Sequence, residues 1–142
     1  MTIKSIPAGL WEWFGECAKI TRLFFNFSDS EDGATAIVPA GDTVVENYID
    51  GSQRRQYTFE LVRFMPVSTE ENDTSNLQMQ EEMESIIEWV NAQNDDGNFP
   101  AMPSGKVAES IEIPETQTGY VAMQDQNIAK YMIPFALTYI KE

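Results

Sequence analysis

The segment that most constrains the fold is Ile128 to Ile140, "IAKYMIPFALTYI". Alternate residues of a strand point to opposite faces, and here both faces are largely apolar, which indicates burial on both sides. A proline in mid-strand favours an edge or a bulge, yet an apolar edge strand promotes aggregation unless something covers it. We expect either a helix of the same chain or a partner subunit as the cover. Four of its residues are candidate interface residues: Tyr131, Met132, Pro134 and Tyr139.

A β-hairpin is predicted at Asp50 and Gly51, because Asp-Gly between strand-like runs is a strong hairpin signal. The returning strand begins with Arg54 and Arg55, two of only nine basic residues in the chain. Neighbours on a strand point to opposite faces, and acidic partners are plentiful. We expect at least one arginine to pair with an acidic group, within the subunit or across an interface. Both arginines are therefore candidate interface residues.

Two helices are predicted. The first begins near Ser5 and Pro7 and carries apolar residues at helical spacing from Leu10 to Cys17. The second is longer and glutamate-rich, with this apolar stripe: Met79, Met83, Ile86, Ile87 and Val90.

Seven strand segments lie before and after the longer helix: Thr21–Ser28, Ala34–Ala40, Asp42–Ile49, Arg54–Val67, Lys106–Ile113, Gly119–Gln124 and Ile128–Ile140. A turn is predicted from Asp29 to Gly33. Strands and helices do not alternate, so the pattern predicts an α+β fold with a mostly antiparallel sheet, packed by the N-terminal helix and the central helix. The length predicts one domain over residues 1–142.

The charge balance restricts the partners. Twenty-three acidic residues against nine basic ones give a formal charge of −14. This argues against nucleic-acid binding, which needs a basic surface, and against anionic membranes. It favours a solubilising surface, a basic partner, or a passage through which nucleic acid slides without binding. No signal peptide or membrane-spanning segment is expected.

Few residues suited to catalysis are present. The chain has no histidine, which removes Cys-His and Ser-His catalysis and most zinc sites. Cys17 is the only cysteine and is predicted to be a core residue. The acidic turns fail the calcium-loop spacing, and no phosphate-binding loop occurs. We expect no cofactor, no metal and no enzymatic activity, although a carboxylate pair acting in acid–base catalysis stays open.

Three segments in this order carry a resemblance to a known family: "NYIDGSQRRQYTFELVRF", "EWVNAQNDDGNFPAMPSGK" and "AKYMIPFALTYIKE". From about Val44 to the end, the chain resembles small tail proteins from phages and prophages of Gram-positive bacteria. The resemblance implies a tail terminator or tail-completion protein, which forms a hexameric ring, caps the tail tube and joins the tail to the head. Its partners would be further copies of itself, the tail tube protein and a head–tail connector protein. It would occupy the host cytoplasm during assembly and then the virion tail.

The alternative is an acidic DNA mimic that inhibits a nucleic-acid-binding protein of the host. A mimic should present its acidic residues in linear rows. Here they are dispersed over turns and one helix, and Arg54 and Arg55 interrupt them.

Overall fold

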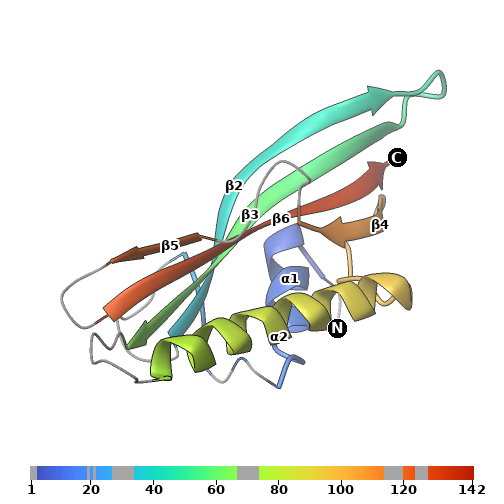
Figure 1. Ribbon diagram of the computed structural model, residues 1–142. Helices are drawn as coiled ribbons and strands as arrows, with labels where there is room; N and C mark the ends of the chain where they lie inside the picture. Colours follow the sequence, from blue (N-terminus) through green and yellow to red (C-terminus); the bar gives the residue numbers. More distant parts are fainter. Residues whose placement is uncertain are drawn as a thin grey trace.

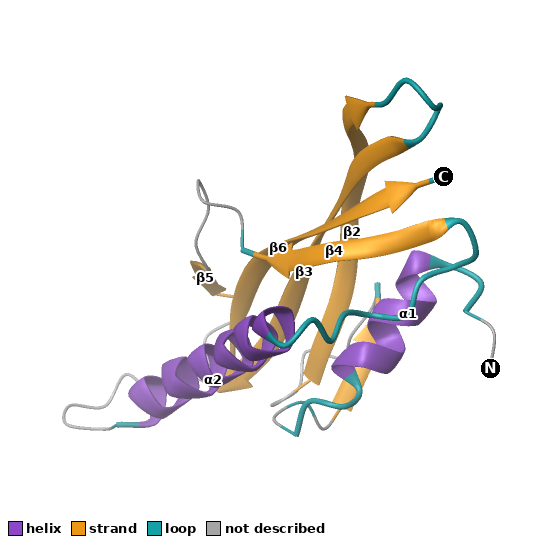
Figure 2. Cartoon of the chain, turned by 90° about the vertical axis from the view of Figure 1, so that its right-hand side faces the viewer, coloured by secondary structure: helices purple, strands orange, loops and turns teal. Residues whose placement is uncertain are grey.

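The computed structural model describes residues 3–18, 20, 22–26, 34–66, 74–113, 120–123 and 128–142. Its elements are α1 (Ile6–Phe14), β1 (Arg22–Phe25), β2 (Ala34–Asn47), β3 (Gln53–Pro66), α2 (Ser75–Asp95), β4 (Lys106–Glu112), β5 (Tyr120–Met123) and β6 (Ile128–Lys141). The strands form one twisted sheet, and both helices lie against the same face of it (Figures 1 and 2). The predicted α+β class is confirmed. The turn predicted at residues 29–33 lies outside the described residues.

The sheet has the strand order β1-β2-β3-β6-β4, with β5 pairing beside β4 on the same side of β6. β1 and β2 are parallel, and each of the other described pairs is antiparallel. β3 and β6 pair without a break from Gln53↔Lys141 to Pro66↔Ile128. β6 is therefore an interior strand rather than an edge strand.

At Pro134, β6 has a described pairing partner on one side only. It is opposite Glu60 of β3. On the other side, the described pairs of β4 end at Ala136 and those of β5 begin at Met132. On that side, Pro134 lies in the gap between the end of β4 and the start of β5. A missing N–H is tolerated there as it is at a sheet edge.

Both faces of β6 are buried within the subunit. The face that carries Tyr131 and Tyr139 packs into the main core with the two helices. On the other face, Met132 joins a smaller cluster with Ala34, Val62 and Phe64. This burial accounts for the two apolar faces of the strand without a second subunit.

The region 34–47 forms one strand, which corrects the expectation of two strands separated near Ala40. β2 continues through two register shifts, one between Pro39 and Gly41 and one between Val44 and Glu46. Such bulges add an unpaired residue and bend the strand while the pairing continues on either side. The proline and glycine that suggest a break therefore mark a bulge.

The first helix begins as predicted and anchors the core. The Ser5 hydroxyl oxygen accepts a hydrogen bond from the Ala8 N–H at 3.2 Å, and Pro7 lies in the first turn. Phe14 is fully buried, which stabilises the fold by about 1.5–3 kcal/mol. The Trp13 indole N–H donates to the Asn98 carbonyl at 2.9 Å and so ties α1 to the loop after α2.

Gly9 is required by this close packing. A Cβ atom placed at Gly9 would lie 2.0 Å from the Ala101 carbonyl oxygen, which belongs to backbone. Alanine normally stabilises a helix over glycine by about 1 kcal/mol. We expect the opposite sign here: Gly9→Ala should destabilise the protein by roughly 1–3 kcal/mol, as overpacking does. The measurement is chemical denaturation followed by circular dichroism.

Gly41→Ala is the matched control, because its Cβ would meet nothing nearer than the Thr58 hydroxyl at 3.7 Å. Its unfolding midpoint should stay close to that of the wild type. An unchanged or higher midpoint for Gly9→Ala would contradict the packing described between α1 and the Ala101 segment.

Candidate functional site

The hairpin of β2 and β3 projects beyond the part of the sheet that the helices cover (Figures 1 and 2). We call residues 42–56 the hairpin arm. Its turn is closed by backbone hydrogen bonds between Tyr48 and Ser52 and between Gly51 and Tyr48. Gly51 has φ +92°, which favours glycine, so the predicted hairpin is confirmed.

Asp50 fixes the conformation of this turn. Its carboxylate accepts hydrogen bonds from the Ser52 hydroxyl at 2.6 Å and from the Ser52 N–H at 2.9 Å. These bonds favour the charged form and lower the pKa of Asp50. The arm therefore ends in an ordered turn.

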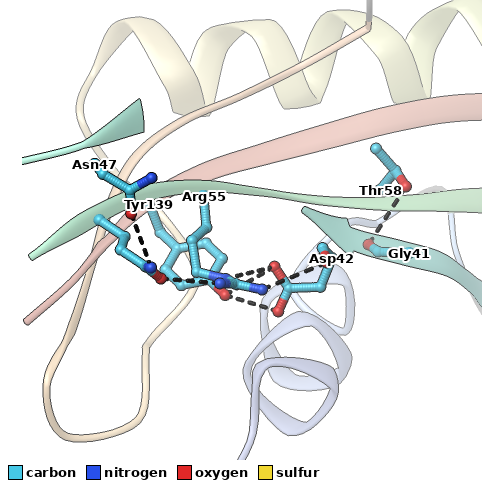
Figure 3. Close-up of polar contacts among 7 residues, drawn as sticks. Gly41, Asp42, Asn47, Arg55, Thr58 and Tyr139 are labelled. Carbon is cyan, nitrogen blue, oxygen red and sulfur yellow. Dashed lines mark hydrogen bonds and ion pairs between the residues drawn. The ribbon is translucent and has the colours of Figure 1, made fainter. Parts of the chain in front are cut away.

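A polar cluster lies at the base of the arm, on the face of the sheet that carries the core (Figure 3). The Arg55 Nε donates to the Asp42 carboxylate at 3.2 Å, and Nη1 donates to the Gln53 side-chain oxygen at 3.0 Å. The Tyr139 hydroxyl donates to Asp42 Oδ2 at 2.8 Å. These contacts join three neighbouring strands, β2, β3 and β6. We call Asp42, Arg55 and Tyr139 the arm cluster.

Tyr139 is the buried member of the arm cluster. Its side chain is 0% exposed. Burial, followed by the hydrogen bond to the Asp42 carboxylate, raises the pKa of Tyr139 to about 12. The phenol therefore stays protonated at neutral pH and acts as a hydrogen-bond donor.

Arg54 makes the corresponding link on the opposite face. Its Nε lies 3.1 Å from a Glu109 carboxylate oxygen of β4, and its Nη1 lies 3.4 Å from Glu46 of β2. The pKa of Arg54 is raised mainly by the hydrogen bond to Glu109. The prediction that at least one arginine pairs with an acidic group is confirmed, since both do so within the subunit.

The six predicted interface residues do not form one surface. Arg55 and Tyr139 meet in the arm cluster, and Arg54 lies on the other face. The remaining three are buried in the body of the sheet: Tyr131, Met132 and Pro134. Whether any of the six contacts another subunit stays a prediction. Sequence reasoning missed the partners Asp42 and Glu109, which only the strand register brings beside the arginines.

Exposed apolar side chains gather along the arm and the strand at the opposite edge. Val44 and Val45 in β2 are 42% and 56% exposed, Ile49 in the turn is fully exposed, and Val107 in β4 is 53% exposed. Single exposed apolar residues are ordinary, but Val44, Val45 and Ile49 lie close together in sequence on one hairpin and offer apolar contact area on the arm.

Carboxylates and Cys17 are the groups of the described residues to consider for metal binding or catalysis. They contain no group of three or more acidic, histidine or cysteine residues placed to hold a metal ion. Cys17 is buried. One surface hollow on α2 includes two carboxylates, but Glu81 is exposed and Glu82 pairs with Arg63 at 3.7 Å, so neither is shielded from solvent or charge. Neither described helix is long and apolar enough to cross a membrane.

The chain was compared with known proteins. No protein-family model matches it, and no curated protein matches its sequence.

The arm cluster should contribute measurably to stability. Tyr139→Phe removes a buried hydrogen bond to a charged group, which we expect to cost about 2 kcal/mol. Tyr48→Phe is the matched control, because its hydroxyl bonds to the Glu46 carboxylate at a solvent-exposed site. That variant should unfold with the wild type in chemical denaturation. Equal midpoints for the two variants would contradict the role given to the arm cluster.

The raised pKa of Tyr139 gives the same prediction a pH signature. Below the usual tyrosine pKa of about 10, the phenol is neutral in both the folded and the unfolded chain. Between pH 10 and 12, the unfolded chain loses its proton first, so the free energy of unfolding falls as the pH rises. Tyr139→Phe should show a shallower fall than the wild type over this interval.

Proposed function

We propose that this protein is a phage virion structural protein of the tail-terminator type, which assembles as a ring, caps the tail tube and joins the tail to the head. The observation that carries the proposal is the hairpin arm. An ordered arm that projects from a packed core and exposes Val44, Val45 and Ile49 is suited to contacts with other subunits.

The character of the rest of the chain supports a structural role. Its resemblance to small phage tail proteins runs from the arm through the segment after α2 to β6. The net charge of −14 suits a ring through which DNA passes without binding, because like charges repel. The partners in this proposal are further copies of the chain, the tail tube protein and a head–tail connector protein. Assembly would take place in the host cytoplasm before the ring joins the virion tail.

The arm also bears on the DNA-mimic alternative. A mimic needs rows of free carboxylates that replace phosphates. On the arm, Asp42 is bound by Arg55, and Glu46 is bound by Arg54. These pairs leave fewer free carboxylates on the arm, and this favours the structural role.

The test is the state of assembly of the purified protein, alone and with tail tubes. We expect light scattering to give the mass of a closed oligomer, with six copies as the predicted number, and negative-stain images to show rings. Added to tail tubes, the protein should occur at tube ends and stop elongation. Binding along the whole tube, or tight one-to-one binding to a basic DNA-binding enzyme without tube binding, would contradict the proposal.

A further inference from the structure

Two strand edges are open at the same end of the sheet. β1 pairs with β2 only at residues 34–37, and Pro39 follows, so no described strand pairs with the outer edge of β2 from Ala40 to Asn47. Figure 1 shows this part of β2 along the upper rim of the molecule, with β3 on its inner side. The Gly41 and Asp42 carbonyl oxygens accept hydrogen bonds from the Thr58 hydroxyl and from Arg55. The outward-facing backbone groups from Thr43 to Asn47 have no described strand partner and can pair with another strand.

β4 supplies the second open edge. It pairs with β6 on one side, and no other described strand pairs with it. The Asn94 side chain accepts the Ile111 N–H at 2.9 Å, which occupies part of this edge. The Lys106 N–H donates to the Pro103 carbonyl at 3.1 Å, and the rest of the stretch up to Ser110 has no described strand partner on this side. Within one subunit the two edges are separated by β3 and β6, so they cannot meet each other.

The strand directions allow the two edges to meet between copies. The pairs β2–β3, β3–β6 and β6–β4 are all antiparallel. β4 therefore runs opposite to β2. A second copy placed beside the first, with its sheet in the same orientation, brings its β4 antiparallel to the first copy's β2 and continues the sheet.

Side chains favour this pairing over the pairing of two β2 edges. The edge from Lys106 to Ser110 carries one basic and one acidic side chain, Lys106 and Glu109, so it adds no net charge to the acidic edge of β2. Val107 and Val45 are both more than half exposed and would cover each other at the same seam. Two β2 edges would instead place Asp42 and Glu46 of both copies at one seam, with no basic residue from either edge between them.

We propose that the β4 edge of one copy, Lys106–Ser110, adds to the β2 edge of the next copy, Ala40–Asn47. The contact uses different surfaces on the two partners, so repetition gives a ring if the rotation closes and a filament if it does not. This inference rests on the proposed function and names the surface by which the ring would assemble.

The experiment uses two single substitutions, Val45→Lys on the β2 edge and Val107→Lys on the β4 edge. Both valines are exposed, so the variants should fold, as circular dichroism can verify. Each lysine places a long, hydrated side chain at every seam of its own assembly, because each contact needs one edge of each kind, and lysine on an edge strand opposes pairing with another strand. By light scattering, we expect each variant alone to fall from the wild-type oligomer to the monomer of 16.1 kDa.

Mixing the two variants is the decisive step. The Val45→Lys protein keeps an intact β4 edge, and the Val107→Lys protein keeps an intact β2 edge. The intact β4 edge of the first variant can pair with the intact β2 edge of the second, and the two edges that remain both carry a lysine. The mixture should therefore give a one-to-one dimer. Leu77→Lys is the control, because Leu77 is exposed on α2 away from both edges, and it should assemble as the wild type does.

The outcomes separate this inference from the proposed function. If both edge variants still form rings, the edge contact is wrong and the ring stands. If the wild type forms filaments that both substitutions abolish, the edge contact stands and the ring is wrong. Loss of assembly in Val45→Lys alone would mean that two β2 edges pair, which overturns the inference. A wild type that is monomeric at every concentration overturns it as well.

Discussion

The unbroken pairing of β3 with β6 is the constraint on which the rest of the structure depends. Each strand has 14 residues, whereas strands in globular proteins usually have five or six. At about 3.3 Å per residue, such a pair spans roughly 46 Å. The two helices cover only part of that length, so the far end of the sheet must project. The hairpin arm, its arginine pairs and the open edges all follow from this excess length.

Local signals in the sequence predicted the local features of this fold. The Asp50-Gly51 turn and both helices were found because each depends on neighbouring residues. The prediction of two strands over 34–47 is wrong, because Pro39 and Gly41 are typical of the end of a strand. The bulge that accommodates them depends on pairing with β3, which lies later in the sequence. The interior place of β6 depends on strand order, which no local pattern encodes. The sequence predicts that the arginines pair with acidic residues. Which acidic residues these are depends on the strand register.

Repulsion between acidic copies limits the ways in which this chain can assemble. A charge of −14 on 142 residues opposes self-association, and it does so most strongly at low ionic strength. On the arm, Arg54 and Arg55 bind carboxylates of neighbouring strands and lower this repulsion where the edges are open. Backbone hydrogen bonds at a strand edge do not depend on side-chain charge. An acidic chain can therefore associate through its edges where its side chains alone would keep copies apart.

The central claim is that the protein works by assembling copies through the open edges of its sheet. Hydrogen exchange measured by mass spectrometry at low and high protein concentration tests it most directly. We expect backbone amides in 40–47 and 106–110 to gain protection as the concentration rises, while the exposed side of α2 does not change. Protection that is independent of concentration in both edges, or that rises elsewhere on the surface, would contradict the account.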